Sequence, residues 1–233
     1  MPTKKYHKLI LPAIIAAFYA AAPANATEDD FGAWAILTTG GAISKDEKLV
    51  VAADLQFRFF EDAEQLGQIL ARASAGYKVD DDLTLSLGYA YIRNNPSGPA
   101  LSEENRIFQQ ASFNIIDNDS ITVKGRSRFE QRFLDGGSND VGLRFRQQVS
   151  VAVPLGDNSK TKLVGYTEPF INVNNTDFGQ DDGFALWRNF VGFNIPVSKD
   201  IAIEPGYLNQ YVFRDGGPDL AQHIIAVGLK TKF

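Results

Sequence analysis

The chain has 233 residues, no cysteine and a formal net charge of −5. The missing cysteines exclude a disulfide-stapled secreted module and a lipid-modified cysteine after a leader. The acidic balance does not favour nucleic-acid binding, and beyond the first residues no apolar run approaches the about 20 residues of a membrane-spanning helix.

Residues 1–26 are typical of a secretory signal peptide. Lys4, Lys5 and Lys8 form a basic start, the apolar run "LILPAIIAAFYAAA" follows, and Ala24-Asn25-Ala26 is a small-x-small cleavage site. We therefore expect a cleaved leader over 1–26 and an exported domain over 27–233. Removal of the three leader lysines leaves a mature net charge near −8.

The rest of the chain reads as strands separated by clusters of Gly, Asn, Asp and Pro. The expected strands are Phe31–Gly40, Leu49–Phe60, Leu66–Val79, Leu83–Arg93, Arg106–Ile116, Ser120–Phe133, Val141–Val153, Lys162–Val173, Phe184–Ile195, Ile201–Phe213 and Gln222–Phe233. Many exceed the usual five or six residues of a soluble strand, whereas a tilted membrane strand needs about 9–11.

The connections alternate between short turns such as "DDD" (80–82) and longer loops such as "NNTDFGQDDG" (174–183). Short periplasmic turns and longer outer loops are typical of an outer-membrane barrel, with the C-terminus on the periplasmic side. We expect an all-β, antiparallel up-and-down transmembrane β-barrel of 10–12 strands. An even number, ten or twelve, leaves Phe31–Gly40 as a plug, a broken strand or a sign of a missed strand.

Alternation of side chains separates two faces of each strand. Over Val141–Val153, Leu143, Phe145 and Val149 lie on one face, and Arg144 and Arg146 lie on the other. The apolar face is expected to meet lipid and the charged face to line the lumen.

The stretch "ITVKGRSRFEQRF" (121–133) shows the same alternation, with a column of four basic residues and one acid. Buried charges must be paired or hydrated, so the glutamates Glu130, Glu168 and Glu204 are expected to pair with the arginines. The predicted lumen network comprises Arg58, Arg126, Arg128, Glu130, Arg132, Arg144, Arg146, Glu168, Arg188 and Glu204.

The last strand carries an expected assembly signal. In "HIIAVGLKTKF", apolar residues occupy every second position before the terminal Phe233, with Val227 and Leu229 on its face. This pattern looks like the signal by which the barrel-assembly machinery recognises outer-membrane barrels, although Thr231 stands where an aromatic residue is common.

Residues 126–233 resemble an uncharacterised bacterial outer-membrane β-barrel family, domain of unknown function 2490. The matching segments are "RSRFEQRF", "LRFRQQVSVAVPL", "YTEPFINVN" and "WRNFVGFNIPVSKDIAIEPGYLNQYVF". The matching positions are Arg126, Arg128, Glu130, Arg132, Arg144, Arg146, Glu168, Arg188 and Tyr207. The resemblance implies the fold and the outer-membrane location and supplies no activity.

Several functions are compatible with this pattern. We expect a monomeric, non-enzymatic barrel in contact with outer-membrane lipid and lipopolysaccharide, either structural or a narrow pore that favours anions. The alternatives are an outer-membrane enzyme that modifies lipid or lipopolysaccharide and a soluble periplasmic barrel that binds a ligand. His223 and Ser127 are both expected on the outer wall, where no Ser–His pair is visible, and the sequence indicates no cofactor or metal site.

Overall fold

The computed structural model describes residues 27–95, 101–136, 138–156 and 159–233. The predicted leader, 1–26, lies outside these residues. The strands are β1 (Thr27–Ala42), β2 (Leu49–Phe60), β3 (Gln65–Lys78), β4 (Leu83–Asn94), β5 (Ser102–Asp117), β6 (Thr122–Leu134), β7 (Gly142–Pro154), β8 (Lys162–Asn172), β9 (Gly183–Pro196), β10 (Ile201–Val212) and β11 (Asp219–Lys232). No helix in the described part of the chain is long and apolar enough to cross a membrane.

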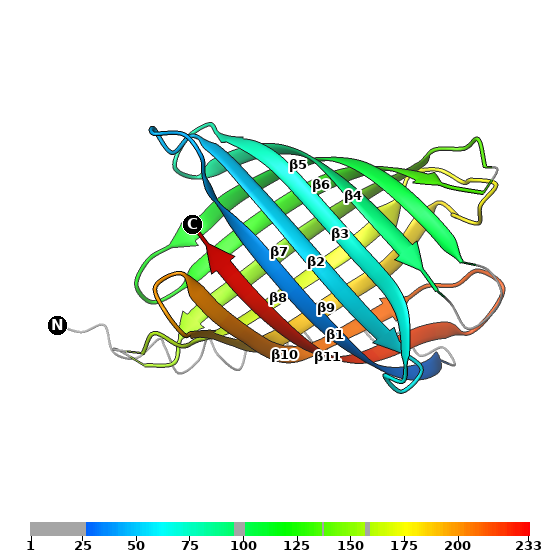
Figure 1. Ribbon diagram of the computed structural model, residues 1–233. Coiled ribbons are helices and arrows are strands. Elements are labelled where there is room, and N and C mark those ends of the chain that lie inside the picture. The colour runs from blue at the N-terminus through cyan, green and yellow to red at the C-terminus, as the bar shows by residue number, and fades with distance from the viewer. Residues whose placement is uncertain (1–26, 96–100, 137, 157–158) are drawn as a thin grey trace.

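The strands form one closed barrel in which each strand pairs with its sequence neighbours (Figure 1). Every pair from β1–β2 to β10–β11 is antiparallel, as an up-and-down barrel requires. The predicted all-β barrel is therefore confirmed. Closure satisfies the backbone groups that an open sheet would leave unpaired at its two edges.

The expectation of an even strand number is wrong, because β1 is a complete strand of the wall. It pairs with β11 in parallel, from Thr27 beside Asp219 to Gly40 beside Lys232. An odd number of strands makes the first and last run in the same direction, so the closing pair must be parallel. The segment Phe31–Gly40 is thus neither a plug nor a broken strand.

The two ends of the barrel differ in their connections. We call the end where β11 finishes the short-turn end, and its connections are 43–48, 79–82, 118–121, 155–161 and 197–200. The opposite, long-loop end carries 61–64, 95–101, 135–141, 173–182 and 213–218. The connection 61–64 is short and departs from the expected alternation. Because β1 and β11 are parallel, β1 begins at the long-loop end.

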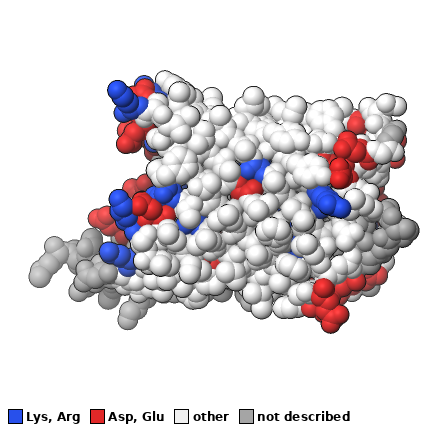
Figure 2. Space-filling model, in the orientation of Figure 1, with Lys and Arg blue, Asp and Glu red and all other residues white. Residues whose placement is uncertain are grey.

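The outer wall is largely apolar. A continuous row runs across the parallel seam from Ile195 through Ile203 and Leu229 to Leu37, each beside the next in register. These side chains are 39–44% exposed although no polar group accompanies them in the row. On the visible face, charged side chains gather near the two ends and few lie between them (Figure 2).

The parallel seam can be tested by cysteine cross-linking, because the natural chain has no cysteine. Ala35 lies beside Val227, and both are exposed on the outer wall. We expect the double variant A35C/V227C to form an intramolecular disulfide on oxidation, which is read as a mobility shift under non-reducing electrophoresis. The control A35C/L229C is displaced by two residues, beyond the about 7 Å Cα separation that a disulfide tolerates. Cross-linking of the control alone would contradict the register.

Candidate functional site

A buried glutamate at the centre of the barrel holds two arginines of the neighbouring strand. Glu130, on β6, is 1% exposed. Its Oε2 accepts hydrogen bonds from Nε and Nη2 of Arg144 at 3.0 and 2.6 Å. Its Oε1 accepts one from Nη1 of Arg146 at 2.7 Å. Glu130 lies directly beside Arg144 in the β6–β7 register, so strand pairing itself positions this contact.

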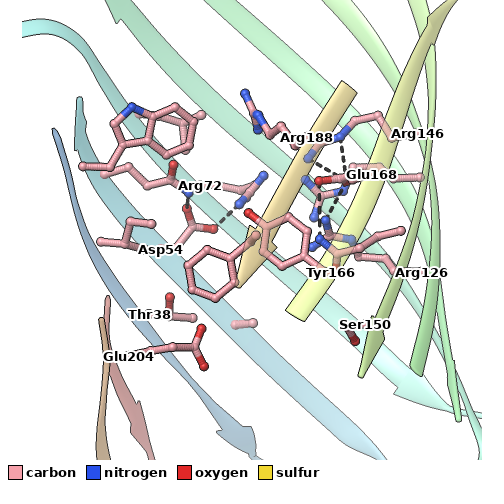
Figure 3. A pocket seen from close by; sticks show the side chains of 18 of the residues that line it. Thr38, Asp54, Arg72, Arg126, Arg146, Ser150, Tyr166, Glu168, Arg188 and Glu204 are labelled. Atoms are coloured by element: carbon pink, nitrogen blue, oxygen red, sulfur yellow. Dashed lines mark hydrogen bonds and ion pairs between the residues drawn. The ribbon is translucent and has the colours of Figure 1, made fainter. Parts of the chain in front are cut away.

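A second buried glutamate extends the pairing to β8. Glu168 accepts hydrogen bonds at Oε1 from Nη2 of Arg126 at 2.7 Å and from Nη2 of Arg146 at 2.9 Å. Figure 3 shows Glu168 between Arg126 and Arg146. Arg146 therefore bridges Glu130 and Glu168, and the three strands β6, β7 and β8 are joined through charged side chains. Charge-assisted hydrogen bonds of this kind are shorter and stronger than neutral ones.

A third glutamate, which the sequence analysis missed, completes the set. Glu104 on β5 receives hydrogen bonds from Nε of Arg106 and Nε of Arg132, both at 2.6 Å. The strand expected from the sequence begins at Arg106 and leaves Glu104 in a loop, whereas β5 begins at Ser102. The alternation Glu104, Arg106, Phe108 continues the charged and aromatic inner face and is the signal that reveals it. We call these three glutamates and their arginine partners the arginine–glutamate layer.

Aromatic rings carry several of the guanidinium groups. The guanidinium carbon of Arg58 lies 3.9 Å from the centre of the Trp34 ring, and that of Arg146 lies 4.1 Å from the Phe170 ring. Arg128 lies 4.2 Å from the Phe108 ring. Such contacts stabilise a cation where water is excluded. Rings therefore replace water around arginines that the carboxylates do not fully surround.

A glycine makes room for one of these rings. Gly88 on β4 lies beside Phe108 on β5 in the strand register. A Cβ atom at position 88 would overlap the ring of Phe108. The glycine allows the ring to lie close to the wall, where it supports Arg128.

The half of the interior nearer the long-loop end is tightly packed. Ile92 and Ile224 are 0% exposed, and Leu208 and Phe170 are almost as deeply buried. The connection 173–182 adds Gln180, whose Oε1 accepts a hydrogen bond from Nη1 of Arg132 at 2.8 Å. An open channel would expose such side chains to water, so the packing of the described residues narrows the interior toward the long-loop end.

The interior also contains a cavity of about 770 Å³, which we call the chamber, and its lining extends to Phe60 and Gln68 near the long-loop end. It reaches the short-turn end, where Lys124, Lys162 and Lys230 line it. Its charged lining residues are Arg58, Arg72, Arg106, Arg126, Arg128, Arg144, Arg146, Arg188, Lys124, Lys162, Lys230, Asp54, Glu168 and Glu204. Figure 3 shows Arg126, Arg146 and Arg188 gathered around Glu168, and Arg72 beside Asp54 on another part of the chamber wall.

The structure brings most of the predicted network together. The chamber lining includes Arg58, Arg126, Arg128, Arg144, Arg146, Glu168, Arg188 and Glu204. Glu130 binds Arg144 of that lining, and Arg132 binds Glu104 of the arginine–glutamate layer. Glu204 departs from the expectation, because it pairs with Lys230 at 2.7 Å and not with the arginines. Its place near the start of β10, at the short-turn end, separates it from them.

The predicted assembly signal and the lone histidine of the described chain lie on the outer wall. Val227, Leu229 and Phe233 are exposed, and the backbone N–H of Phe233 donates to the carbonyl of Gly40 at 3.3 Å. His223 Nδ1 lies 2.6 Å from the hydroxyl oxygen of Tyr207. Ser127 instead donates to Gln147, so the structure does not bring Ser127 to His223.

Comparison with known proteins gives a family and no activity. A family model described as "Protein of unknown function (DUF2490)" matches residues 31–221. An uncharacterized protein of Methylorubrum extorquens is 35% identical over 182 residues, which cover 78% of this chain and 79% of the relative. No solved structure matches.

The arginine–glutamate layer predicts a large stability effect at one position. The substitution Glu130→Gln leaves Arg144 and Arg146 without their shared carboxylate in a buried site. We expect the free energy of unfolding, measured by urea titration of the folded barrel, to fall by about 3–5 kcal/mol. The matched control Glu64→Gln lies in an exposed turn and should change it by less than about 0.5 kcal/mol. Equal effects of the two variants would show that Glu130 is not held as described.

Proposed function

The chain belongs to the DUF2490 family, whose function is unknown, and we propose that it is a monomeric, non-enzymatic outer-membrane β-barrel closed to ion flow by its arginine–glutamate layer. In this proposal the leader exports the chain, and the barrel-assembly machinery recognises the final strand. The outer wall then meets outer-membrane lipid and lipopolysaccharide, with the short-turn end in the periplasm.

The location is supported by the inside-out distribution of polarity. A soluble barrel buries apolar side chains and exposes charged ones, whereas this barrel encloses Glu104, Glu130 and Glu168 and exposes apolar rows. Apolar area of this extent on a folded monomer marks a surface that meets lipid or another protein. An apolar band around a polar interior is the pattern of an outer-membrane barrel.

Polar side chains on the outer wall are hydrogen-bonded to one another. Gln109 and Gln131 exchange two hydrogen bonds, at 3.2 and 3.1 Å. Thr167 donates to Asn189 at 2.8 Å and accepts from the indole N–H of Trp187 at 2.7 Å. Pairing of this kind is required in lipid, where water cannot satisfy a polar group.

The single observation that supports a closed barrel is the packing at the long-loop end. An anion-favouring pore needs a continuous aqueous path past the arginines. Toward the long-loop end the chamber lining includes buried side chains, among them Arg58 and Gln210 at 7% and 8% exposure. The glutamates of the arginine–glutamate layer are neutralised by bidentate and bridging arginines. The charged side chains could serve a structural role or line an anion-favouring pore. This geometry fits the structural role better.

Location is tested by fractionation and by one outward substitution. We expect the chain in the outer-membrane fraction with heat-modifiable electrophoretic mobility. Leu37→Arg places a charge within the apolar row and should lower the free energy of unfolding in lipid vesicles by about 2–4 kcal/mol if the row lies near the bilayer midplane.

The matched control for Leu37→Arg is Asp119→Arg, in an exposed turn of the short-turn end, where we expect little change. A chain found only in the soluble periplasm, with Leu37→Arg as harmless as the control, would overturn the proposed location.

Closure is tested by planar-bilayer conductance. We expect the refolded chain to give no channel steps at any applied voltage, because the arginine–glutamate layer leaves no water-filled path. Insertion is verified separately by heat-modifiable mobility of protein recovered from vesicles of the same lipid. Reproducible anion-selective steps from the unmodified chain would replace the closed barrel by the pore.

A further inference from the structure

The chamber has a strong excess of positive charge. Eleven arginine and lysine side chains line it, against three aspartate and glutamate side chains. Like charges gathered in a medium of low dielectric repel one another strongly, because water screens them poorly. Even with Glu130 and Glu104 close behind the lining, the cations outnumber the acids. The chamber therefore favours the entry of anions.

Two arginines of the lining have neutral hydrogen-bond partners and, in the described part of the chain, no carboxylate nearby, whereas Arg128, which also bonds only to a glutamine, lies 3.8 Å from Glu130. Arg58 donates to Gln56 and Gln68, and Arg188 donates to Gln210. Within the described residues no carboxylate oxygen lies within 4.0 Å of either guanidinium. A glutamine oxygen satisfies an N–H group and leaves the charge in place. This separates Arg58 and Arg188 from Arg144 and Arg146, which glutamates neutralise.

These two arginines share one aromatic ring. Their guanidinium carbons lie 3.9 and 5.0 Å from the centre of Trp34, which comes from β1. Tyr166 and Phe190 stack on each other with ring centres 5.2 Å apart and line the same chamber. The chamber wall thus places planar guanidinium groups beside aromatic rings.

The mouth of the chamber is also basic. Lys124 and Lys230 are exposed at the short-turn end, and Lys162 opens β8 beside them in the lining. Glu204 pairs with Lys230 and leaves the other two lysines without a carboxylate within 4.0 Å among the described residues. Positive charge at the entrance of a narrow cleft concentrates anions there and speeds their arrival.

We propose that the chamber is a binding site for a small multivalent oxyanion, one that carries phosphate or carboxylate groups and enters from the short-turn end. Arg58 and Arg188 grip its charged groups as planar forks, and Trp34 supports them from one side. The proposal rests on the closed barrel for its route of entry, because a closed long-loop end leaves the short-turn end as the way in.

The chain contains its own reporter for this site. It has two tryptophans, of which Trp34 faces the chamber and Trp187 lies on the outer wall. In the variant Trp187→Phe the fluorescence comes from Trp34 alone. Sodium pyrophosphate and sodium citrate serve as phosphate and carboxylate probes, and sodium chloride at equal ionic strength serves as the reference.

We expect saturable fluorescence changes with pyrophosphate, citrate or both, and none with chloride. Arg58→Gln and Arg188→Gln should each weaken binding about tenfold or more, since each removes a charged hydrogen-bond donor. The matched control Arg93→Gln changes an exposed arginine outside the chamber lining and should leave the affinity unchanged. Isothermal titration calorimetry of the unmodified chain gives the affinities without Trp187→Phe.

No saturable response to either probe, or equal losses in Arg188→Gln and Arg93→Gln, would overturn the anion site. Neither result would affect the closed barrel, which the conductance measurement tests on its own. Conductance together with saturable binding at Arg188 would overturn closure and keep the site. A response to one probe alone would identify phosphate or carboxylate as the preferred group.

Discussion

The bridge that Arg146 makes between Glu130 and Glu168 is the contact on which the interior depends. Each carboxylate is almost fully buried, and a buried charge without a partner destabilises a fold by several kcal/mol. Arg146 reaches both because it stands on β7, between the strands that carry them. Two other arginines complete the contacts of these glutamates. Arg144 binds Oε2 of Glu130, and Arg126 binds Glu168 beside Arg146. Arg126, Arg144, Arg146 and Glu168 of the layer also form part of the chamber wall.

Alternation in the sequence predicts which face of a strand a residue occupies, and it does so well here. The column from Lys124 to Arg132 lies inside the barrel, as expected from its period of two. Alternation does not predict which residues face each other across the barrel, or how far each residue lies from the barrel's ends. Glu204 lies on the predicted inner face of its strand, but it lies nearer the short-turn end than the arginines. It therefore pairs with Lys230. Glu104 was missed because a strand end is set by pairing with Ile92 on β4, and no local turn residue marks it.

The aromatic supports of the arginines were also beyond the reach of the sequence. Trp34, Phe108 and Phe170 stand on three strands that are far apart in the chain, and only closure of the barrel brings them to one interior. Their inward parity is visible in the sequence. Their contact with particular guanidinium groups depends on the stagger of the strands. The strand number was uncertain for a related reason: whether an eleventh strand joins the wall depends on a pairing between residues about 190 positions apart.

That pairing has a kinetic consequence. Ten of the eleven contacts between neighbouring strands can form as hairpins, each from segments that are adjacent in the chain. The parallel contact of β1 with β11 cannot, because it joins the two extremes of the domain, and loop-closure entropy grows with the length of chain enclosed. Contacts of such long range slow folding. β1 therefore stays paired on one side only until β11 has formed. The rate of this closing step sets how long an unpaired strand edge persists during assembly.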